Sequence, residues 1–385
     1  MQTAIGLLFL GSVFVGALTV LLGCVLPRLS AIGHLRDQDA GALLMVQFAF
    51  AAGAALLVRR NFHWTLVWGY ALIALAVLAL HLLPKALAIP IIAAYGLGLG
   101  LVMTSNSMLV GRIFPGRRGV AIASLNLCWS LGAALTPWLI ARTFDLFSVS
   151  FLTAIVAVTS ALFAAVPFLG GFQRIIDVDL PVEPPAMGAT PAVAYFGLLA
   201  FLYVGIESAT GNWMSSYALR VSTWDLSRSN LATACFWTAL LLGRMAAPLI
   251  LLAIAEERLY LLSACGAVMG GFVLVAAHSG WLVLLGAVLS GLSLAPIFSL
   301  IVALFMARAG QPRSSGWVFA VAASGGAFLP WLTGIVSSAA GSLRIGMLVP
   351  ACSALLLLLL GSRLNSAADA GAPGSLRAGV VPGRG

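Results

Sequence analysis

The chain has 385 residues, of which 62% are apolar and only 8% charged, and its mean hydropathy is +1.09. A soluble domain carries about 25% charged residues, so this composition excludes a protein that faces water on all sides. The net charge is +9, but the basic residues are spread over many short loops without a basic stripe, which excludes a nucleic-acid partner. The chain is therefore predicted to lie in a lipid bilayer.

Twelve apolar segments follow one another along the chain, and a transmembrane helix needs roughly 20 such residues. The connections between them are short and leave no room for a soluble catalytic domain, so we expect no enzyme. The predicted spans are 4–27, 41–58, 65–83, 87–111, 119–141, 149–170, 192–214, 231–254, 259–277, 281–306, 315–338 and 344–362.

Two polar stretches divide the chain into parts. The longest interior connection, residues 173–191, contains three acids and four prolines, which predicts an extended cytoplasmic linker. Residues 365–385 are rich in Gly, Ala and Pro, and we expect a disordered cytoplasmic tail. The remaining parts, 1–172 and 192–364, are predicted to be two six-helix bundles.

Basic residues favour one orientation of these spans. With the N-terminus inside, 13 Lys and Arg residues fall on the cytoplasmic side and seven on the outer side. An even number of spans keeps both ends together, so we expect a multi-pass, monomeric protein of the plasma (inner) membrane with both termini cytoplasmic. The five cysteines lie inside predicted spans without CxxC spacing, and the four histidines lie at span ends, so neither a metal nor a cofactor is expected.

An internal duplication relates the two halves. Gly132-Ala-Ala-Leu-Thr-Pro-Trp-Leu in the fifth span matches Gly325-Gly-Ala-Phe-Leu-Pro-Trp-Leu in the eleventh, 193 positions later. Gly6-Leu-Leu in the first span matches Gly197-Leu-Leu in the seventh, 191 positions later. Duplicated bundles of this kind can turn their polar groups toward a shared central cavity.

Several segments carry a family resemblance. They are Gly96-Leu-Gly-Leu-Gly100 with Arg112-Ile-Phe-Pro-Gly-Arg-Arg-Gly119, Tyr203-Val-Gly-Ile-Glu207 with Gly211-Asn212-Trp213, Phe236-Trp237 with Gly243-Arg244, and Ala295-Pro-Ile-Phe298. They resemble the major facilitator superfamily, and the Tyr-Val-Gly-x-Glu stretch with Gly-x-Trp resembles its fucose/glucose-type sugar transporter branch. The resemblance implies an all-α integral membrane fold of twelve helices in two pseudo-symmetric six-helix bundles, with alternating access to one central site.

The chain departs from this family in two places. The loop between the second and third spans is reduced to Gly53 and Arg59-Arg60-Asn61, without the family's acid. The first and fourth spans lack the acids that sugar:proton symporters of this branch often carry.

Glu207 is the one carboxylate deep in any predicted span. An ionisable side chain at membrane depth is costly unless it faces protein or water, so Glu207 is a functional candidate. It is predicted either to couple transport to protons or to accept hydrogen bonds without titrating. The coupling ion can be a proton or sodium.

Candidate binding residues lie on several predicted spans. In the fifth, an i, i+3, i+4 stripe offers amide, indole and hydroxyl groups, which suit sugar hydroxyls but also suit contacts between helices. In the seventh, the Gly205/Gly211 spacing predicts a bend that turns further groups inward. The candidates are Asn106, Asn126, Trp129, Ser130, Tyr203, Asn212, Trp213, Trp237 and Trp317.

Two arginines are candidate gate residues. Arg112 and Arg244 belong to the matching segments, and the resemblance implies contacts at the cytoplasmic gate. Arg244 can instead be a simple positive-inside anchor. No basic residue is expected in the middle of a span.

Two transport functions fit these patterns. The first is a secondary active transporter of a small neutral polar solute, a sugar or polyol, because a single buried acid accompanies Asn, Trp and Ser groups without buried basic residues. The alternative is a proton-driven exporter of amphipathic drugs or metabolites, favoured by the apolar residues Met103, Phe201, Phe236 and Phe298.

Overall fold

Apolar segments form helices throughout the computed structural model of the chain, which describes residues 2–58, 61–143, 149–169, 191–309, 315–362 and 364. In lipid, backbone N–H and C=O groups find no water, so each segment satisfies its own hydrogen bonds as a helix. Among the described residues, eleven helices are long and apolar enough to cross a membrane. A twelfth, α2, is shorter and more polar because it begins with Asp37-Gln38-Asp39.

The helices fall into two groups along the chain. The first bundle, as the term is used below, contains α1 (Gln2–Gly33), α2 (Asp37–Ala54), α3 (Phe62–Leu82), α4 (Ala88–Ile113), α5 (Arg118–Thr143) and α6 (Val149–Ala165). The second bundle contains α8 (Pro191–Val221), α9 (Leu226–Ile250), α10 (Glu256–Ala276), α11 (Gly280–Leu294), α12 (Ile297–Ala309), α13 (Ser315–Ala340), α14 (Leu343–Gly346) and α15 (Leu348–Gly361). Short 3-10 turns, η1 (Lys85–Leu87), η2 (Pro115–Arg117) and η3 (Val166–Phe168), lie between helices.

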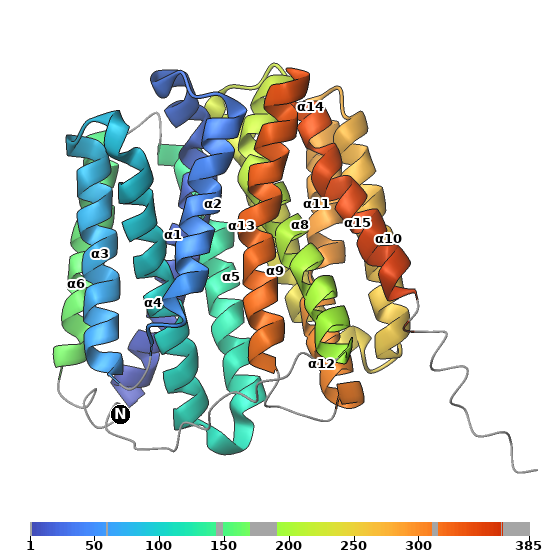
Figure 1. Ribbon diagram of the computed structural model, residues 1–385, viewed down its shortest axis with the longest axis horizontal. Coiled ribbons are helices and arrows are strands. Elements are labelled where there is room, and N and C mark those ends of the chain that lie inside the picture. The colour runs from blue at the N-terminus through green and yellow to red at the C-terminus, as the bar shows by residue number, and fades with distance from the viewer. Residues whose placement is uncertain are drawn as a thin grey trace, which may run out of the picture.

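Each bundle packs mainly within itself, and the two meet along specific helix pairs. Helices α3 and α6 stand at one edge of the molecule and α10 and α15 at the other (Figure 1). Between them, α2 packs against α13 and α5 packs against α9. These two pairs form most of the contact between the bundles, and a smaller contact joins α1 to α8.

Helix bounds differ from the predicted spans where polar residues extend a helix or proline interrupts it. Helix α8 continues to Val221, past the predicted end at 214, and α9 begins five residues early because Asp225 caps it by accepting from the Arg228 N–H. The predicted tenth span is broken into α11 and α12 at Ala295-Pro296, since proline has no N–H to continue the helix. The predicted linker, apart from Pro191, and the predicted tail lie outside the described residues.

The duplicated glycines serve the same purpose in both bundles. A Cβ added at Gly132 of α5 would collide with the carbonyl oxygen of Val13 in α1. A Cβ added at Gly325 of α13 would collide with the carbonyl oxygen of Phe201 in α8. In each bundle, therefore, the glycine lets two helix backbones touch, and the repeat seen in the sequence marks equivalent helix crossings.

These crossings predict a stability difference between glycines. Gly132→Ala and Gly325→Ala each force two backbones apart, and we expect a loss of about 1–3 kcal/mol in the free energy of unfolding. Gly6→Ala is the matched control, because a Cβ at Gly6 meets no atom within 4 Å. Thermal unfolding of the three variants in detergent should lower the midpoint for the first two only; equal midpoints for all three would contradict this account.

Candidate functional site

A central cavity of about 420 Å³ lies between the two bundles. The first bundle contributes lining residues from α1, α2, α4 and α5, and the second bundle from α8, α9 and α13. Its size is within the range of small-molecule sites. Because both bundles form its walls, any relative movement of the bundles changes its shape.

The cavity is open at one end of the helices. Leu56, just beyond the end of α2, is 79% exposed, and Phe319, near the start of α13, is 45% exposed. The lining residues farther along these helices, Gln47 of α2 and Gly326 of α13, are buried. We call the end where α2 stops and α13 starts the open end, and the opposite end the closed end.

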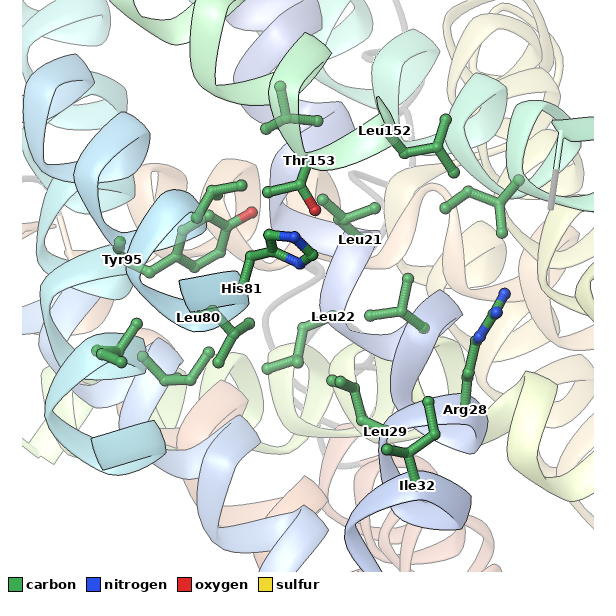
Figure 2. A pocket seen from close by; sticks show the side chains of 17 residues that line it. Leu21, Leu22, Arg28, Leu29, Ile32, Leu80, His81, Tyr95, Leu152 and Thr153 are labelled. Carbon is green, nitrogen blue, oxygen red and sulfur yellow. The ribbon is translucent and has the colours of Figure 1, made fainter. Parts of the chain in front are cut away.

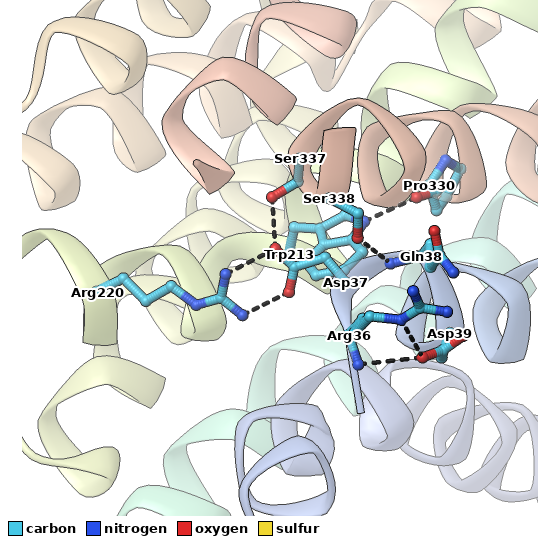
Figure 3. A network of polar contacts seen from close by, with 9 residues as sticks. All are labelled: Arg36, Asp37, Gln38, Asp39, Trp213, Arg220, Pro330, Ser337 and Ser338. Carbon is cyan, nitrogen blue, oxygen red and sulfur yellow. Dashed lines mark hydrogen bonds and ion pairs between the residues drawn. The ribbon is translucent and has the colours of Figure 1, made fainter. Parts of the chain in front are cut away.

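A polar network joins the bundles at the closed end (Figure 3). Arg220 of α8 donates from both Nη atoms to the Asp37 carboxylate at the start of α2, at 2.7 and 2.5 Å. Ser337 of α13 also donates to Asp37, and the Gln38 N–H donates to Ser338 Oγ at 2.8 Å. The network therefore ties the first turn of α2 to the last turns of α8 and α13.

Close backbone packing lies beneath this network. A Cβ at Gly41 of α2 would stand 3.2 Å from the Cα atom of Trp331 in α13, and one at Gly334 would collide with the carbonyl oxygen of Asp37. On the neighbouring pair, a Cβ at Gly23 of α1 would stand 2.8 Å from the Cα atom of Asn212 in α8. The closed end is thus sealed by backbones in contact.

Four residues that line the cavity each carry a buried polar atom that makes no hydrogen bond to any described residue. Two are acceptors, Gln47 Oε1 and Asn212 Oδ1, and two are donors, the indole N–H groups of Trp129 and Trp237. Buried polar atoms are nearly always bonded, so four such atoms in one cavity indicate a site for a polar ligand. Each bundle supplies one donor and one acceptor.

The orientation of the two amides follows from their other contacts. The Gln47 amide nitrogen donates to the Thr19 carbonyl at 2.9 Å, and the Asn212 amide nitrogen donates to the Ser208 carbonyl at 2.8 Å. With the nitrogens held in this way, both amide oxygens are left without a partner among the described residues. The two indole rings meet edge to face, with centroids 5.7 Å apart.

A charged cluster adjoins this wall. Glu207, which lines the cavity, accepts a hydrogen bond from the Tyr203 hydroxyl and one from Arg244 Nη2 at 2.9 Å. Arg244 Nη1 donates to Ser130 Oγ at 2.6 Å. Glu207 and Arg244 therefore form an ion pair in the middle of the protein.

The expectation that no basic group lies in the middle of a span is wrong. Arg244 starts one turn and a half before the end of α9, but helical side chains lean toward the N-terminus of their helix. Its guanidinium therefore points back along α9 and reaches Glu207. The predicted contact at the cytoplasmic gate is replaced by a contact beside the cavity.

Three other candidate residues lie away from the cavity wall, and the side chain of a fourth is not described. Asn106 is buried between α4 and α1, where its amide donates to Ser12 Oγ at 3.2 Å, so it is away from the cavity wall. Asn126 is exposed and outside the lining set. Arg112 ends α4 with its guanidinium carbon 4.5 Å from the centroid of the Phe62 ring. The Trp317 side chain lies outside the described part of the structure.

Helix α8 runs without a break from Pro191 to Val221, so the Gly205/Gly211 spacing does not interrupt the seventh span. Trp213 consequently faces α13 and donates its indole N–H to the Pro330 carbonyl at 2.9 Å, as Figure 3 also shows. Tyr203 is fully buried, with its ring stacked on Phe298 of α12 at a centroid distance of 5.6 Å.

Gln47 is a site residue that the sequence reasoning missed. It is fully buried in the wall of the cavity. The signal was present, because Gln47 is the one amide within the otherwise apolar run Leu43–Ala54.

A second cavity, of about 200 Å³, lies inside the first bundle among α1, α3, α4, α5 and α6 (Figure 2). Its wall is mostly leucine, isoleucine and valine. Its polar groups already have partners, since the Tyr95 hydroxyl donates to the Leu18 carbonyl at 2.6 Å and His81 Nε2 lies 3.1 Å from Ser150 Oγ. The central cavity is therefore the candidate functional site.

Comparisons with known proteins agree with this architecture. No family model matches the chain. It is 23% identical over 381 residues to Bypass of stop codon protein 6 of Saccharomyces cerevisiae, covering 85% of this chain and 75% of that protein. It is 26% identical over 354 residues to the glucose/mannose transporter GlcP of Bacillus subtilis, covering 83% and 84%.

Solved structures show the same fold. The nucleoside transporter NupG superposes with a TM-score of 0.76 over 94% of this chain and 99% of that chain, at 12% identity. The major facilitator superfamily transporter FucP, in its outward conformation, superposes with a TM-score of 0.61 over 93% and 98%, at 17% identity.

The fold is that of the major facilitator superfamily, and the relatives and solved structures whose names state an activity are transporters and not enzymes. The sequence similarity to GlcP agrees with the resemblance to the fucose/glucose-type branch that the sequence motifs indicated, and FucP shares the fold.

The closed-end network yields a prediction about conformational balance. Burial raises the pKa of Asp37, but hydrogen bonds from Arg220 and Ser337 and the charge of Arg220 outweigh it, so the pKa lies below its ordinary value of 3.8. The charged carboxylate thus stabilises closure at higher pH, and this contribution is lost only as the pH falls through that lowered pKa. Asp37→Asn should weaken closure by about 1 kcal/mol, because Arg220 is half exposed.

A cysteine in place of Ala40, which is fully buried in the first turn of α2, measures this effect through its rate of labelling by a thiol reagent between pH 5 and 8. We expect faster labelling with Asp37→Asn and no pH dependence from Asp37 itself in that range. Asp39→Asn is the matched control, since Asp39 pairs only with the exposed Arg36 of its own helix end among the described residues. Equal rates in both variants would show that Asp37 does not hold the end closed.

Proposed function

We propose that the chain moves a small neutral sugar or polyol across the membrane by alternating access of the central cavity, coupled to protons through Glu207. The observation that carries this proposal is that four residues lining the cavity each hold a buried polar atom without a partner among the described residues. Two donors and two acceptors, with no net charge between them, complement a ligand with several hydroxyl groups. Each hydroxyl both donates and accepts.

The charge balance of the cavity supports a neutral ligand. Arg244 is the basic residue found beside the cavity, and its charge is matched by Glu207 at 2.9 Å. An anionic substrate would need an unmatched cation in the wall. The names of the relatives agree in kind, because GlcP is a glucose/mannose transporter and FucP is a fucose:proton symporter.

Alternating access follows from the distribution of contacts. The closed end is held by backbone packing and by the Asp37 network, whereas the lining residues at the open end are exposed. A ligand that bonds to both bundles at once favours their approach at the open end. We propose that this approach exposes the same site at the other end.

The proposed setting retains the orientation argued from the basic residues. The chain lies in the plasma (inner) membrane as a monomer of two bundles, 1–172 and 192–364, with both termini cytoplasmic. The open end, where α1 begins, then faces the cytoplasm.

Export of amphipathic compounds is the second candidate, favoured by apolar lining residues such as Met103, Phe48 and Phe319. Of the four apolar residues considered from the sequence, Met103 lines the cavity, while Phe236 is buried and Phe298 packs on Tyr203. Export of an apolar compound accounts less well for this cavity, because an apolar ligand would leave the four buried polar atoms without hydrogen bonds.

Ligand binding tests the carrying observation. Purified protein is screened with D-glucose, D-mannose, D-xylose, L-fucose and tetraphenylphosphonium by thermal shift, followed by equilibrium binding. Gln47→Leu and Trp237→Phe each remove one hydrogen bond of about 1 kcal/mol, so we expect affinity for a bound sugar to fall roughly five-fold in each. Trp68→Phe, an exposed indole outside the cavity, should leave affinity unchanged. Binding of the lipophilic cation alone would favour export.

Coupling is tested separately in proteoliposomes. Glu207→Gln keeps the shape of the side chain but holds no exchangeable charge, so we expect it to exchange sugar across the membrane without accumulating it against a gradient. The wild type should accumulate sugar under an imposed proton gradient in sodium-free buffer. If the variant accumulates sugar with the same pH dependence as the wild type, Glu207 is not the coupling group.

A further inference from the structure

Helix α13 lines the central cavity with one of its faces. Its lining residues recur every three or four positions, as expected for one side of a helix, and they are Phe319, Ala320, Ala323 and Gly326. Pro330 lies four residues beyond Gly326 within the same helix, so it continues this face toward the closed end. The last lining residue of α13 is therefore a glycine, and a proline follows it one turn later.

This proline leaves one backbone carbonyl without its usual partner. In an α-helix each carbonyl accepts from the N–H group four residues later, and proline has no N–H. Because α13 continues through Pro330, the carbonyl of the buried residue Gly326 has lost its helical donor. No side chain or neighbouring helix of the described part of the chain donates to it instead. A buried carbonyl of this kind needs a donor from elsewhere.

Gly326 lies where three helices meet at the cavity. A Cβ added to it would stand 3.2 Å from both Ser208 Oγ and Val204 Cγ1 of α8, and 3.9 Å from Phe48 Cδ1 of α2. All three neighbours line the cavity, and two helices of the second bundle therefore meet one helix of the first at this point. Since glycine has no side chain, its backbone is left uncovered there.

Ser208 supplies a second polar group beside this carbonyl. It lines the cavity, and its hydroxyl makes no hydrogen bond to any described residue. A hydroxyl can both donate and accept, whereas a carbonyl can only accept. Two neighbouring groups of these kinds match two adjacent hydroxyl groups of a ligand, one of which donates to the carbonyl while the other bonds to Ser208.

The first bundle has the same proline without this arrangement. Pro137 of α5 removes the helical donor of the Ala133 carbonyl in the same way. Ala133, however, is fully buried in the core and lies outside the lining set of the cavity. The duplicated motif therefore frees one carbonyl at the cavity and one within packed side chains.

We propose that the Gly326 carbonyl, freed by Pro330, and the Ser208 hydroxyl form a subsite that binds two adjacent hydroxyl groups of the transported solute. This inference rests on the proposed transport of a neutral sugar or polyol and adds a source of specificity. A solute that lacks one of the two hydroxyls leaves a buried polar group unpaired and binds more weakly. Because Phe48 stands at the same point, a ligand held there also contacts the first bundle.

The experiment weakens the carbonyl without changing a side chain. Lactic acid, the hydroxy-acid analogue of alanine, replaces Ala327 in the full chain and converts the Gly326 carbonyl from an amide into an ester carbonyl, which is a weaker acceptor. The same replacement at Ala134 weakens the Ala133 carbonyl and is the matched control, because the two alanines occupy equivalent positions of the duplicated segment. Equilibrium binding of D-glucose, D-mannose, D-xylose and L-fucose is measured in lipid nanodiscs.

Substitutions provide a second route to the same groups. Pro330→Ala supplies the missing N–H to the Gly326 carbonyl, and Pro137→Ala is its control in the other bundle. Ser208→Ala removes the neighbouring hydroxyl. Ser324→Ala is the control for it, because the Ser324 hydroxyl is exposed and donates to the Val321 carbonyl of its own helix.

We expect the ester at residue 327, Pro330→Ala and Ser208→Ala each to lower the affinity for a bound sugar about five-fold, the effect of one hydrogen bond. The three controls should stay within two-fold of the wild type. One monodeoxy analogue of the bound sugar should bind the wild type about five-fold more weakly than the parent sugar. The protein with the ester at residue 327 should distinguish the two less well, since the contact that separates them is already weakened.

The other outcomes separate this subsite from the proposed function. If a sugar binds the wild type but the ester at residue 327 and Pro330→Ala match their controls, the subsite is overturned while sugar transport stands. If none of the four sugars binds the wild type, the proposed function fails and the subsite fails with it. The ester keeps every side chain in place, so it provides a test even where Pro330→Ala does not fold.

Discussion

Lipid offers no hydrogen bonds, and this constraint decides where every polar side chain of the protein lies. Many serine and threonine hydroxyls within the helices donate to the carbonyl one turn earlier, as Thr19, Thr136 and Thr333 do. Several of the groups that are not satisfied in this way lie at the boundary between the bundles. There they form a network at the closed end, a charged cluster beside the cavity, and the unpartnered atoms on the cavity wall.

Close backbone contacts at glycines serve two different purposes, one within each bundle and one between the bundles. Glycines within each bundle, such as Gly132 and Gly325, hold helices that stay together. Glycines across the interface, such as Gly41 and Gly334, let α2 and α13 touch at the closed end, where the proposed alternating access requires a reversible contact. Reversibility is physically reasonable because these backbone surfaces carry no large side chains that would need to repack when they separate.

The sequence was sufficient to predict the architecture. In a bilayer, long apolar runs with short loops indicate transmembrane helices, and a repeated glycine-proline pattern indicates two duplicated bundles. It was also sufficient to select Glu207, Trp129 and Trp237, which the structure places on the cavity wall. The sequence did not predict the contacts that depend on the length or direction of a side chain. Arg244 was assigned by the position of its Cα atom, although its guanidinium lies well back along the helix. Asn106 and Trp213 were assigned by type, although neighbouring helices satisfy both.

The interruption of the tenth span at Ala295-Pro296 has a consequence for the charged cluster. Because α12 starts anew after the break, it can tilt without carrying α11 with it. Its first turn bears Phe298, whose ring lies between Tyr203 and Phe319, with centroid distances of 5.6 and 5.9 Å. Tyr203 is the hydroxyl donor to Glu207, and Phe319 stands in the cavity wall. One aromatic ring of this short half-helix therefore contacts both a residue of the cavity wall and the hydroxyl donor to Glu207, so the packing of α12 connects the cavity wall with the charged cluster.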